Sequence, residues 1–255
     1  MSLRCFVDDL ANAATPAEGT VSRPVIGLSE PEARHALASR RLSVGDAVVV
    51  FDGRGHEASA AIITAARGHV EVRVDEIRTR PRPLPTLTLA VAMPKGPRQD
   101  QLIEKCTELG VAAIQPILTE RSVAGVSDHK REKWRRTTIE AAKQSGRCWL
   151  PELLRPVPLH EIVGGLSRYD VAVAAMLPDD GGAEPITDWI GRLSGRRSIL
   201  AFVGPEGGWA PAEAQALLAA GVQPISLGPN VLRIETAAIA VAAIVHAWHS
   251  PAGDR

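Results

Sequence analysis

The sequence of 255 residues predicts an α/β protein with two domains, a small β-barrel followed by a parallel sheet that helices cover. Closely spaced apolar runs dominate residues 1–78, and antiparallel strands at such spacing are typical of a small barrel. Residues 79–86, TRPRPLPT, contain three prolines and two arginines, so they predict a stiff, extended linker. Over residues 87–255, apolar runs alternate with helix-like segments, and this alternation predicts a parallel sheet.

The first region is predicted to contain mainly strands and one short helix. The Asp-Gly pair in residues 52–55 lies between two apolar runs and indicates a turn. A glycine-rich loop that binds a dinucleotide opens a helix, whereas this one precedes the strand-like HEASAAIIT, so we interpret it as a turn. The predicted helix covers 31–40 after Ser29 as N-cap, and the predicted strands cover 47–51, 58–64 and 70–74.

The second region is predicted to alternate strands and helices to its end. Its last helix, TAAIAVAAIVHAWH, has no formal charge and is apolar nearly all round, so either a second subunit or the rest of its own chain buries it. The predicted strands cover 87–93, 112–118, 170–175, 199–203 and 224–227, and the predicted helices include 98–109, 129–146 and 236–249.

Composition limits the classes of function. The formal net charge is zero, so any RNA site must be a local basic patch. Acidic residues stand where a signal peptide has its apolar core, and no apolar segment reaches the roughly 20 residues that span a bilayer, so we expect a cytoplasmic protein without membrane contact. The three cysteines are far apart and the histidines are scattered, so we expect reduced thiols and no metal. No motif for ATP or NAD is present.

Two of the predicted strands end in glycine-containing loops. Strand 199–203 breaks at Gly-Pro-Glu-Gly-Gly over 204–208, and strand 224–227 breaks at Gly-Pro-Asn over 228–230. Ligands of parallel sheets bind at the carboxyl ends of strands, and glycine lets a ligand lie against bare backbone. These loops therefore predict a ligand site.

The same stretch carries a family resemblance. GPEGG at 204–208, followed by a helix with Glu213 and by LGPNVLRIETA at 227–237, resembles the cofactor loops of the SPOUT methyltransferases, trefoil-knotted RNA methyltransferases that use S-adenosylmethionine. The pattern is most similar to the family that methylates N3 of a uridine in the decoding region of 16S ribosomal RNA. Further matching positions are Lys95, ELGV at 108–111, ERS at 120–122, Glu140-Ala141, Gln144-Ser145, Arg147 and Pro151.

The resemblance implies a knotted parallel-sheet domain with a PUA-like, RNA-binding barrel before it. It also implies a homodimer, S-adenosylmethionine as cofactor, and 16S ribosomal RNA or the small ribosomal subunit as partner. The cofactor-binding residues that it implies are Met176, Leu177, Gly204, Pro205, Glu206, Gly207, Gly208, Leu227, Gly228, Leu232, Arg233 and Thr236.

Two positions depart from the pattern of the family. Ala210 stands where a Ser or Thr is frequent, which costs the following helix about 1 kcal/mol of N-capping and leaves Glu213 without a reciprocal capping partner. Asn230 stands where relatives often have a basic residue. Neither departure removes a group that methyl transfer is known to need.

A basic segment is the candidate for RNA contact. Residues 129–147 contain seven Lys or Arg and two Glu, and such a segment either attracts phosphate or forms a solvated helix face. Glu140, Gln144 and Arg147 have the spacing of one helical face. The predicted RNA-binding residues, each with an ordinary surface role as the alternative, are Arg4, Arg40, Arg41, Lys95, Arg121, Ser122, Arg135, Gln144 and Arg147.

Three residues are candidates for the chemistry. Uracil N3 carries a proton that must leave, and Glu206 or Glu235 could accept it. Arg233 could stabilise the resulting imide anion. The structural alternatives are that Glu206 braces its loop and that Glu235 interacts with the dipole of the last helix. Two other functions stay open: a SPOUT methyltransferase that acts on a tRNA base or ribose 2′-hydroxyl, and a non-catalytic RNA-binding factor for ribosome assembly.

Overall fold

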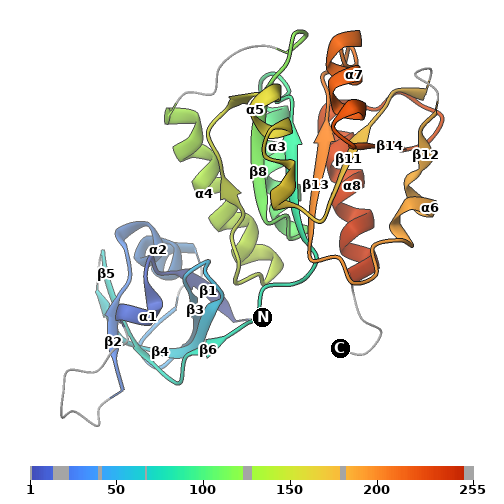
Figure 1. Cartoon of the computed structure of the whole chain (residues 1–255). Coiled ribbons are helices and arrows are strands. Elements are labelled where there is room, and N and C mark those ends of the chain that lie inside the picture. The colour runs from blue at the N-terminus through green and yellow to red at the C-terminus, as the bar shows by residue number, and fades with distance from the viewer. Residues whose placement is uncertain are drawn as a thin grey trace. The chain divides into compact units, whose positions relative to one another are not determined.

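The computed structural model describes residues 2–13, 23–39, 42–66, 68–122, 128–178 and 182–249, which form two compact units (Figure 1). The first unit comprises Met1–Arg82 and Ile139–Leu150, and the second comprises Pro83–Thr138 and Pro151–Arg255. The chain therefore passes from the first unit to the second between Arg82 and Pro83, inside the Pro-rich segment. Residues 139–150 pack with the first unit although they follow the start of the second in sequence.

The first unit is built on a mixed sheet with strand order β1-β3-β4-β5-β2, in which β6 also pairs with β4. Among the described strand pairs of this unit, only β1 and β3 are parallel. Val70, Val72 and Val74 alternate with exposed or half-buried residues, as expected for a strand with one face on a core. The elements are β1 (Leu3–Phe6), α1 (Leu10–Ala13), β2 (Val25–Gly27), α2 (Glu30–Arg34), the π-helix η1 (His35–Ser39), β3 (Ala47–Phe51), β4 (His56–Ala66), β5 (His69–Val74) and β6 (Arg78–Thr79).

The turn over residues 52–55 also holds a distant part of the chain. The amide N of Leu150 donates to the carbonyl O of Gly53 at 2.9 Å, and the amide N of Gly55 donates to the carbonyl O of Cys148 at 2.9 Å. A Cβ on Gly55 would lie 2.4 Å from the ring of Trp149, so the close approach requires glycine. The predicted turn is thus also the surface to which residues 148–150 attach.

The second unit contains an eight-stranded sheet in which every described strand pair is parallel. The strand order is β10-β8-β7-β13-β11-β14-β12, and β9 pairs with β8. The elements are β7 (Thr86–Val91), α3 (Arg98–Glu108), β8 (Ala113–Leu118), α4 (Asp128–Ser145), β9 (Glu152–Leu153), β10 (Val157–Pro158), α5 (Leu159–Val163), the 3₁₀-helix η2 (Leu166–Arg168), β11 (Val171–Ala175), β12 (Glu184–Pro185), α6 (Ile186–Ile190), β13 (Ser198–Val203), α7 (Pro211–Ala219), β14 (Gln223–Ser226) and α8 (Ile234–His249).

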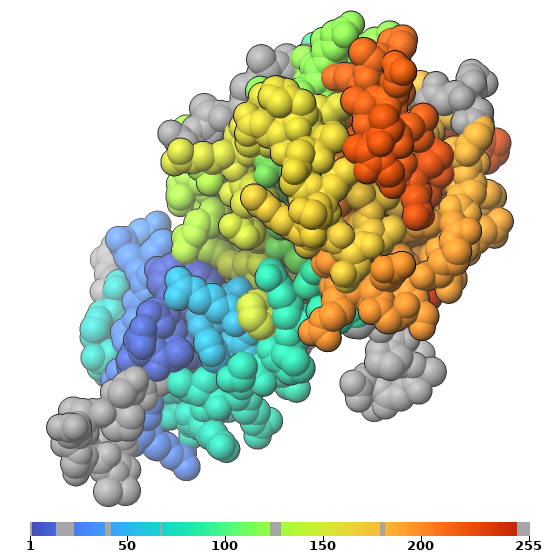
Figure 2. Space-filling model, viewed as in Figure 1, coloured from blue at the N-terminus to red at the C-terminus, as the bar shows by residue number. Residues whose placement is uncertain are grey.

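Both faces of this parallel sheet are buried. Along β13, Ile199 and Val203 point into a core that they share with α3, α6 and α8, whereas Leu200 and Phe202 point into a second core with α5 and α7. Figure 2 shows α5 (yellow) and α7 (orange-red) side by side on one face of this unit. Because both faces are covered, the strands read as continuous apolar runs in the sequence.

A candidate cofactor cleft at the carboxyl edge of the parallel sheet

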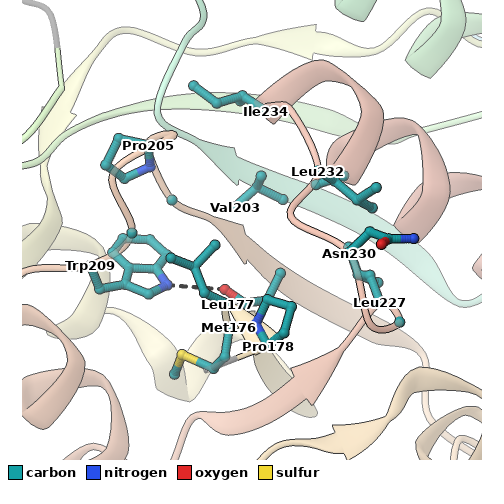
Figure 3. Close-up of a pocket in the computed structure, with 15 residues that line it drawn as sticks. Met176, Leu177, Pro178, Val203, Pro205, Trp209, Leu227, Asn230, Leu232 and Ile234 are labelled. Carbon is teal, nitrogen blue, oxygen red and sulfur yellow. Dashed lines mark hydrogen bonds between the residues drawn. The ribbon is translucent and has the colours of Figure 1, made fainter. Parts of the chain in front are cut away.

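A cleft lies where three adjacent parallel strands end. Ala175 in β11 pairs with Val203 in β13 and with Ile225 in β14, so the loops that follow these strands meet at one edge. The empty space between the loops, with the solvent at its open side included, is about 490 Å³. The lining residues are Ala175, Met176, Leu177, Pro178, Val203, Gly204, Pro205, Gly208, Trp209, Leu227, Gly228, Asn230, Leu232, Ile234 and Ala237 (Figure 3).

The lining of this cleft is neutral and mainly apolar. Figure 3 shows Leu177, Val203 and Leu232 around the open space, and no charged side chain is among the described residues that line it. Such walls suit the flat face of an adenine, while loop backbone groups can hydrogen-bond its edge and a ribose. A cofactor with phosphates would find no cationic partner there. The chemistry of the cleft therefore fits S-adenosylmethionine better than ATP or NAD.

Trp209 fixes the first glycine loop to the neighbouring strand. Its indole Nε1 donates to the carbonyl O of Ala175 at 3.1 Å, and its ring contacts Phe202 edge-on. Before it, Gly208 has φ of +72°, and a Cβ there would lie 2.7 Å from Cδ1 of Leu177. A side chain at this position would therefore strain the backbone and displace the Leu177 side chain, so the loop favours glycine here.

The structure brings most of the predicted cofactor-binding residues to this cleft. Eight of them line it: Met176, Leu177, Gly204, Pro205, Gly208, Leu227, Gly228 and Leu232. The other four, Glu206, Gly207, Arg233 and Thr236, belong to the same loops or to the start of α8 and do not line the cleft. Sequence reasoning missed Trp209, although a large aromatic residue directly after a glycine loop was a usable signal.

The three candidate catalytic residues differ in their surroundings. The Glu206 side chain is 51% exposed, and its Oε1 lies 3.4 Å from Nη1 of Arg98. Arg233 is exposed directly before α8. Glu235 is 5% exposed, and its Oε2 has no hydrogen-bond partner among the described residues. A buried carboxylate oxygen without a partner is unusual and marks Glu235 for attention.

Glu213 does have a capping partner, so the expectation that Ala210 leaves it without one is wrong, whereas the side chain of Ala210 makes no capping hydrogen bond, as expected. Glu213 Oε2 accepts from the amide N of Ala210 at 3.0 Å, which completes the half of the capping box that needs no hydroxyl. Its Oε1 accepts from the amide N of Glu120 at 2.8 Å. One carboxylate thus holds both the start of α7 and the turn after β8. In that turn, Arg121 Nη1 donates to the carbonyl O of Gly207 at 2.6 Å.

The predicted RNA-binding residues have varied surroundings. Arg40 and Arg41 lie outside the described residues. The Arg4 side chain is 11% exposed, with Nη1 3.3 Å from Glu57 and Nη2 donating to the carbonyl O of Arg147 at 3.1 Å. Those that the structure describes as exposed are Lys95, Arg121, Arg135 and Gln144. RNA contact by any of these residues stays a prediction.

In the basic segment, residues 129–147, some of the cationic side chains bind groups of the protein itself and are less available for RNA. Lys143 Nζ lies 2.9 Å from Glu32 and 3.0 Å from Glu140, and Arg131 Nη2 donates to the carbonyl O of Leu153 at 3.1 Å. Because α4 ends at Ser145, the prediction that Arg147 shares a helical face with Glu140 is wrong.

The sequence predicts neither a metal site nor a membrane-spanning helix, and the described part of the chain can be searched for both. Within it, no group of three or more His, Cys, Asp or Glu side chains could hold a metal ion. None of its helices combines the length and apolar content needed to cross a bilayer.

Comparison with known proteins identifies the family. Residues 80–246 match the family model described as RNA methyltransferase domain, and residues 28–75 match the RNA methyltransferase PUA domain. A curated protein of Synechocystis sp., named ribosomal RNA small subunit methyltransferase E, is 35% identical over 207 residues, which cover 81% of this chain and 68% of the relative. The protein of that name from Mycobacterium bovis is 34% identical over 232 residues, which cover 88% of this chain and 88% of the relative.

A solved structure agrees with this assignment. Ribosomal RNA small subunit methyltransferase E of Neisseria gonorrhoeae, bound to S-adenosylmethionine, superimposes with a TM-score of 0.81 at 28% identity, over 97% of this chain and 98% of the other. The predicted α/β fold, a SPOUT-type parallel-sheet domain after a PUA-like domain, is therefore confirmed. The protein is a methyltransferase, and it belongs to the RNA methyltransferase family whose curated members are named ribosomal RNA small subunit methyltransferase E.

Proposed function

We propose that this protein transfers a methyl group from S-adenosylmethionine to small-subunit ribosomal RNA, at N3 of a uridine in the decoding region of the 16S molecule. The observation that carries the proposal is the neutral, glycine-opened cleft at the ends of β11, β13 and β14. The Neisseria relative, which shares the fold over nearly its whole length, was crystallised with S-adenosylmethionine. The target base follows from the family resemblance in the sequence.

The cleft residues divide into two roles in this proposal. Leu177, Leu227 and Leu232 pack against the adenine, and backbone groups near Gly204 and Gly228 hydrogen-bond the adenine and ribose. When bound, S-adenosylmethionine supplies a methyl group that is activated by its positively charged sulfur. The chain's own residues must then orient the uracil, exclude water and accept one proton.

Glu235 is the better of the two proton acceptors. It is buried beside cleft residue Ile234, and no described residue bonds its Oε2, so this oxygen would take the N3 proton once the uracil reaches it, whereas Glu206 is half exposed and paired with Arg98. As the proton passes to the carboxylate, the N3 lone pair forms the bond to the methyl carbon and the carbon–sulfur bond breaks. Arg233 donates to the oxygens of the imide and stabilises the negative charge that N3 gains.

The partner in this proposal is 16S ribosomal RNA or the small ribosomal subunit in the cytoplasm. Lys95 is exposed after β7 and is a candidate for phosphate contact, as are Arg135 and Gln144 on α4. The predicted homodimer would bury the apolar surface of α8, where Trp248 is 38% exposed. Light scattering should give twice the mass of the 27.1 kDa chain, and a monomer mass would remove the dimer.

The proposed function is tested by nucleoside mass spectrometry. Small subunits and free 16S RNA from cells that lack the protein are incubated with the protein and S-adenosylmethionine, then digested. The expected product is N3-methyluridine in one substrate or both. A 2′-O-methylated product, or modification of tRNA alone, would favour the other methyltransferases. A protein that fails to bind S-adenosylmethionine in calorimetry would instead be a non-catalytic factor.

A further inference from the structure

We infer that Arg121 is a positioning residue that holds the glycine loop of the cofactor cleft, the segment 204–210, in its binding conformation. The inference rests on the proposed function, because it gives a purpose to that cleft. In the sequence, Arg121 is a candidate for RNA contact. Its hydrogen bond instead assigns it to the cofactor loop.

The contact is made to an exposed residue between the two ends of this loop. Arg121 Nη1 donates to the carbonyl O of Gly207 at 2.6 Å, and its Cδ lies 3.5 Å from the position of a Cβ on Gly207. Gly207 is exposed and directly precedes Gly208, which lines the cleft. The far end of the loop has its own supports, since Trp209 bonds to Ala175 and Glu213 accepts from the amide of Ala210. Within the loop, the amide N of Gly208 donates to the carbonyl O of Pro205 at 2.9 Å, and Arg121 adds a hydrogen bond from outside the loop, to Gly207.

The turn that carries Arg121 is itself fixed. Ser122 Oγ accepts from the amide N of Thr119 at 2.9 Å and donates to the carbonyl O of Thr119 at 3.0 Å. Glu213 Oε1 accepts from the amide N of Glu120, which joins the turn to the start of α7. In the sheet, β7 lies between β8 and β13, so this turn crosses one strand to reach the loop. Two separate hydrogen bonds across that strand form a brace, not a chance surface contact.

Arg98 also contacts this loop, but in a different way from Arg121. Arg98 Nη1 lies 3.4 Å from Glu206 Oε1, and both side chains are at least 36% exposed. An exposed ion pair of this length contributes little. Arg121 differs because it bonds to a backbone carbonyl, so its loss changes the loop conformation directly. A lysine would keep the charge of Arg121 and lose the planar fork that fixes the direction of the bond.

The test compares Arg121→Ala and Arg121→Lys with the matched control Arg98→Ala in the full chain. Hydrogen–deuterium exchange of the peptide that contains residues 204–210, without cofactor, should become faster in both Arg121 variants and stay unchanged in the control. Calorimetry should show S-adenosylmethionine affinity weakened about three- to tenfold, as expected for one exposed charge-assisted hydrogen bond. Affinity for 16S RNA and the midpoint of thermal unfolding should change little.

The opposite pattern would overturn the inference. If loop exchange and cofactor affinity stay at the wild-type level while RNA affinity falls and its salt dependence weakens, Arg121 is a phosphate ligand. If exchange increases throughout the second unit, Arg121 only stabilises the fold. Failure of the wild-type protein to bind S-adenosylmethionine would sink the proposed function, and the exchange of the loop would still decide whether Arg121 holds it.

Discussion

Single residues decide the shape of the cofactor cleft, and Gly208 shows how. Its backbone has φ of +72°, and the atom nearest to a Cβ at this position would be Cδ1 of Leu177, which itself lines the cleft. A side chain at position 208 would therefore combine backbone strain with a displaced cleft wall. The effect on ligand binding should exceed the effect on folding.

We expect Gly208→Ala to weaken S-adenosylmethionine binding at least tenfold, because the added Cβ displaces Leu177 from the cleft wall and the backbone strain of about 1–2 kcal/mol favours a shift of the loop that lines the cleft. Calorimetry measures this. The control is Gly221→Ala, since Gly221 has φ of +83° and nothing within 4 Å of an added Cβ. The control should lose similar stability and keep its affinity. Equal affinities in the two variants would contradict the role of Gly208.

Glu235→Gln should lower the rate constant for methyl transfer by about 100-fold or more, because the amide cannot accept the N3 proton. S-adenosylmethionine affinity should stay near that of the wild type. Single-turnover assays with 16S RNA measure the rate, and Glu206→Gln is the control, with nearly unchanged turnover expected. Wild-type turnover in Glu235→Gln would leave this carboxylate with only a structural role.

At the scale of elements, some of the charged side chains of α4 form ion pairs within the protein, so the charge of this helix is not all available to RNA. Lys143 lies in the part of α4 that belongs to the first unit, and its side chain and that of Glu32 are only 7% and 8% exposed. The remaining oxygen of Glu32, Oε2, has no partner among the described residues. Removing Lys143 would therefore leave a buried carboxylate without compensation.

Lys143→Met should destabilise the first unit by about 3 kcal/mol, since breaking a buried ion pair from one side costs about 3–5 kcal/mol. Urea unfolding measures the loss. Lys133→Ala is the control, because its pair with Asp100 is exposed and should contribute less than about 1 kcal/mol. A double variant, Lys143→Met with Glu32→Leu, should recover much of the loss.

The Lys143–Glu32 pair also predicts how the free energy of unfolding depends on pH. Burial acts to lower the pKa of Lys143, but hydrogen bonds and charges from Glu32 and Glu140 outweigh it, so this pKa is raised. A raised pKa in the folded state stabilises the protein fully below the unfolded pKa of about 10.4, and the contribution is lost as the pH rises through the folded pKa. The stability difference between wild type and Lys143→Met should therefore be constant from about pH 7 to 9 and shrink above about pH 10.4.

At the scale of the whole molecule, each unit has its own hydrophobic core and a thiol inside it. Cys5 belongs to the core of the first unit and Cys106 to that of the second. Burial raises the pKa of each thiol to about 12, with a smaller contribution from Glu32 at Cys5. Neither thiol is therefore ionised or accessible at neutral pH in the folded protein.

Both cysteines should resist alkylation by iodoacetamide at pH 8 in the native protein and react on unfolding. Labelling at increasing urea concentration, followed by peptide mass spectrometry, then reports the unfolding of each unit by its own thiol. Lys143→Met should shift the midpoint for Cys5 more than that for Cys106. Rapid labelling of Cys106 without denaturant would contradict a tightly packed second core.

The sequence by itself determined the class of fold, the family and the loops that form the cleft. Strands predicted at 199–203 and 112–118 are β13 (Ser198–Val203) and β8 (Ala113–Leu118), because a strand buried on both faces is a continuous apolar run. The glycine loops could also be predicted from local sequence, because Gly and Pro are the residues that favour a turn at the end of a strand.

Only the tertiary structure decided which side chains serve these loops. Trp209 bonds to Ala175, and Arg121 to Gly207, across 34 and 86 residues of sequence. Residues 139–150 likewise pack with a barrel that begins more than a hundred residues earlier. Such partners follow from strand order and the path of the chain in space, and no local periodicity records that order. Sequence patterns report whether a residue is buried or turns the chain, whereas the choice of its partner is made by the whole fold.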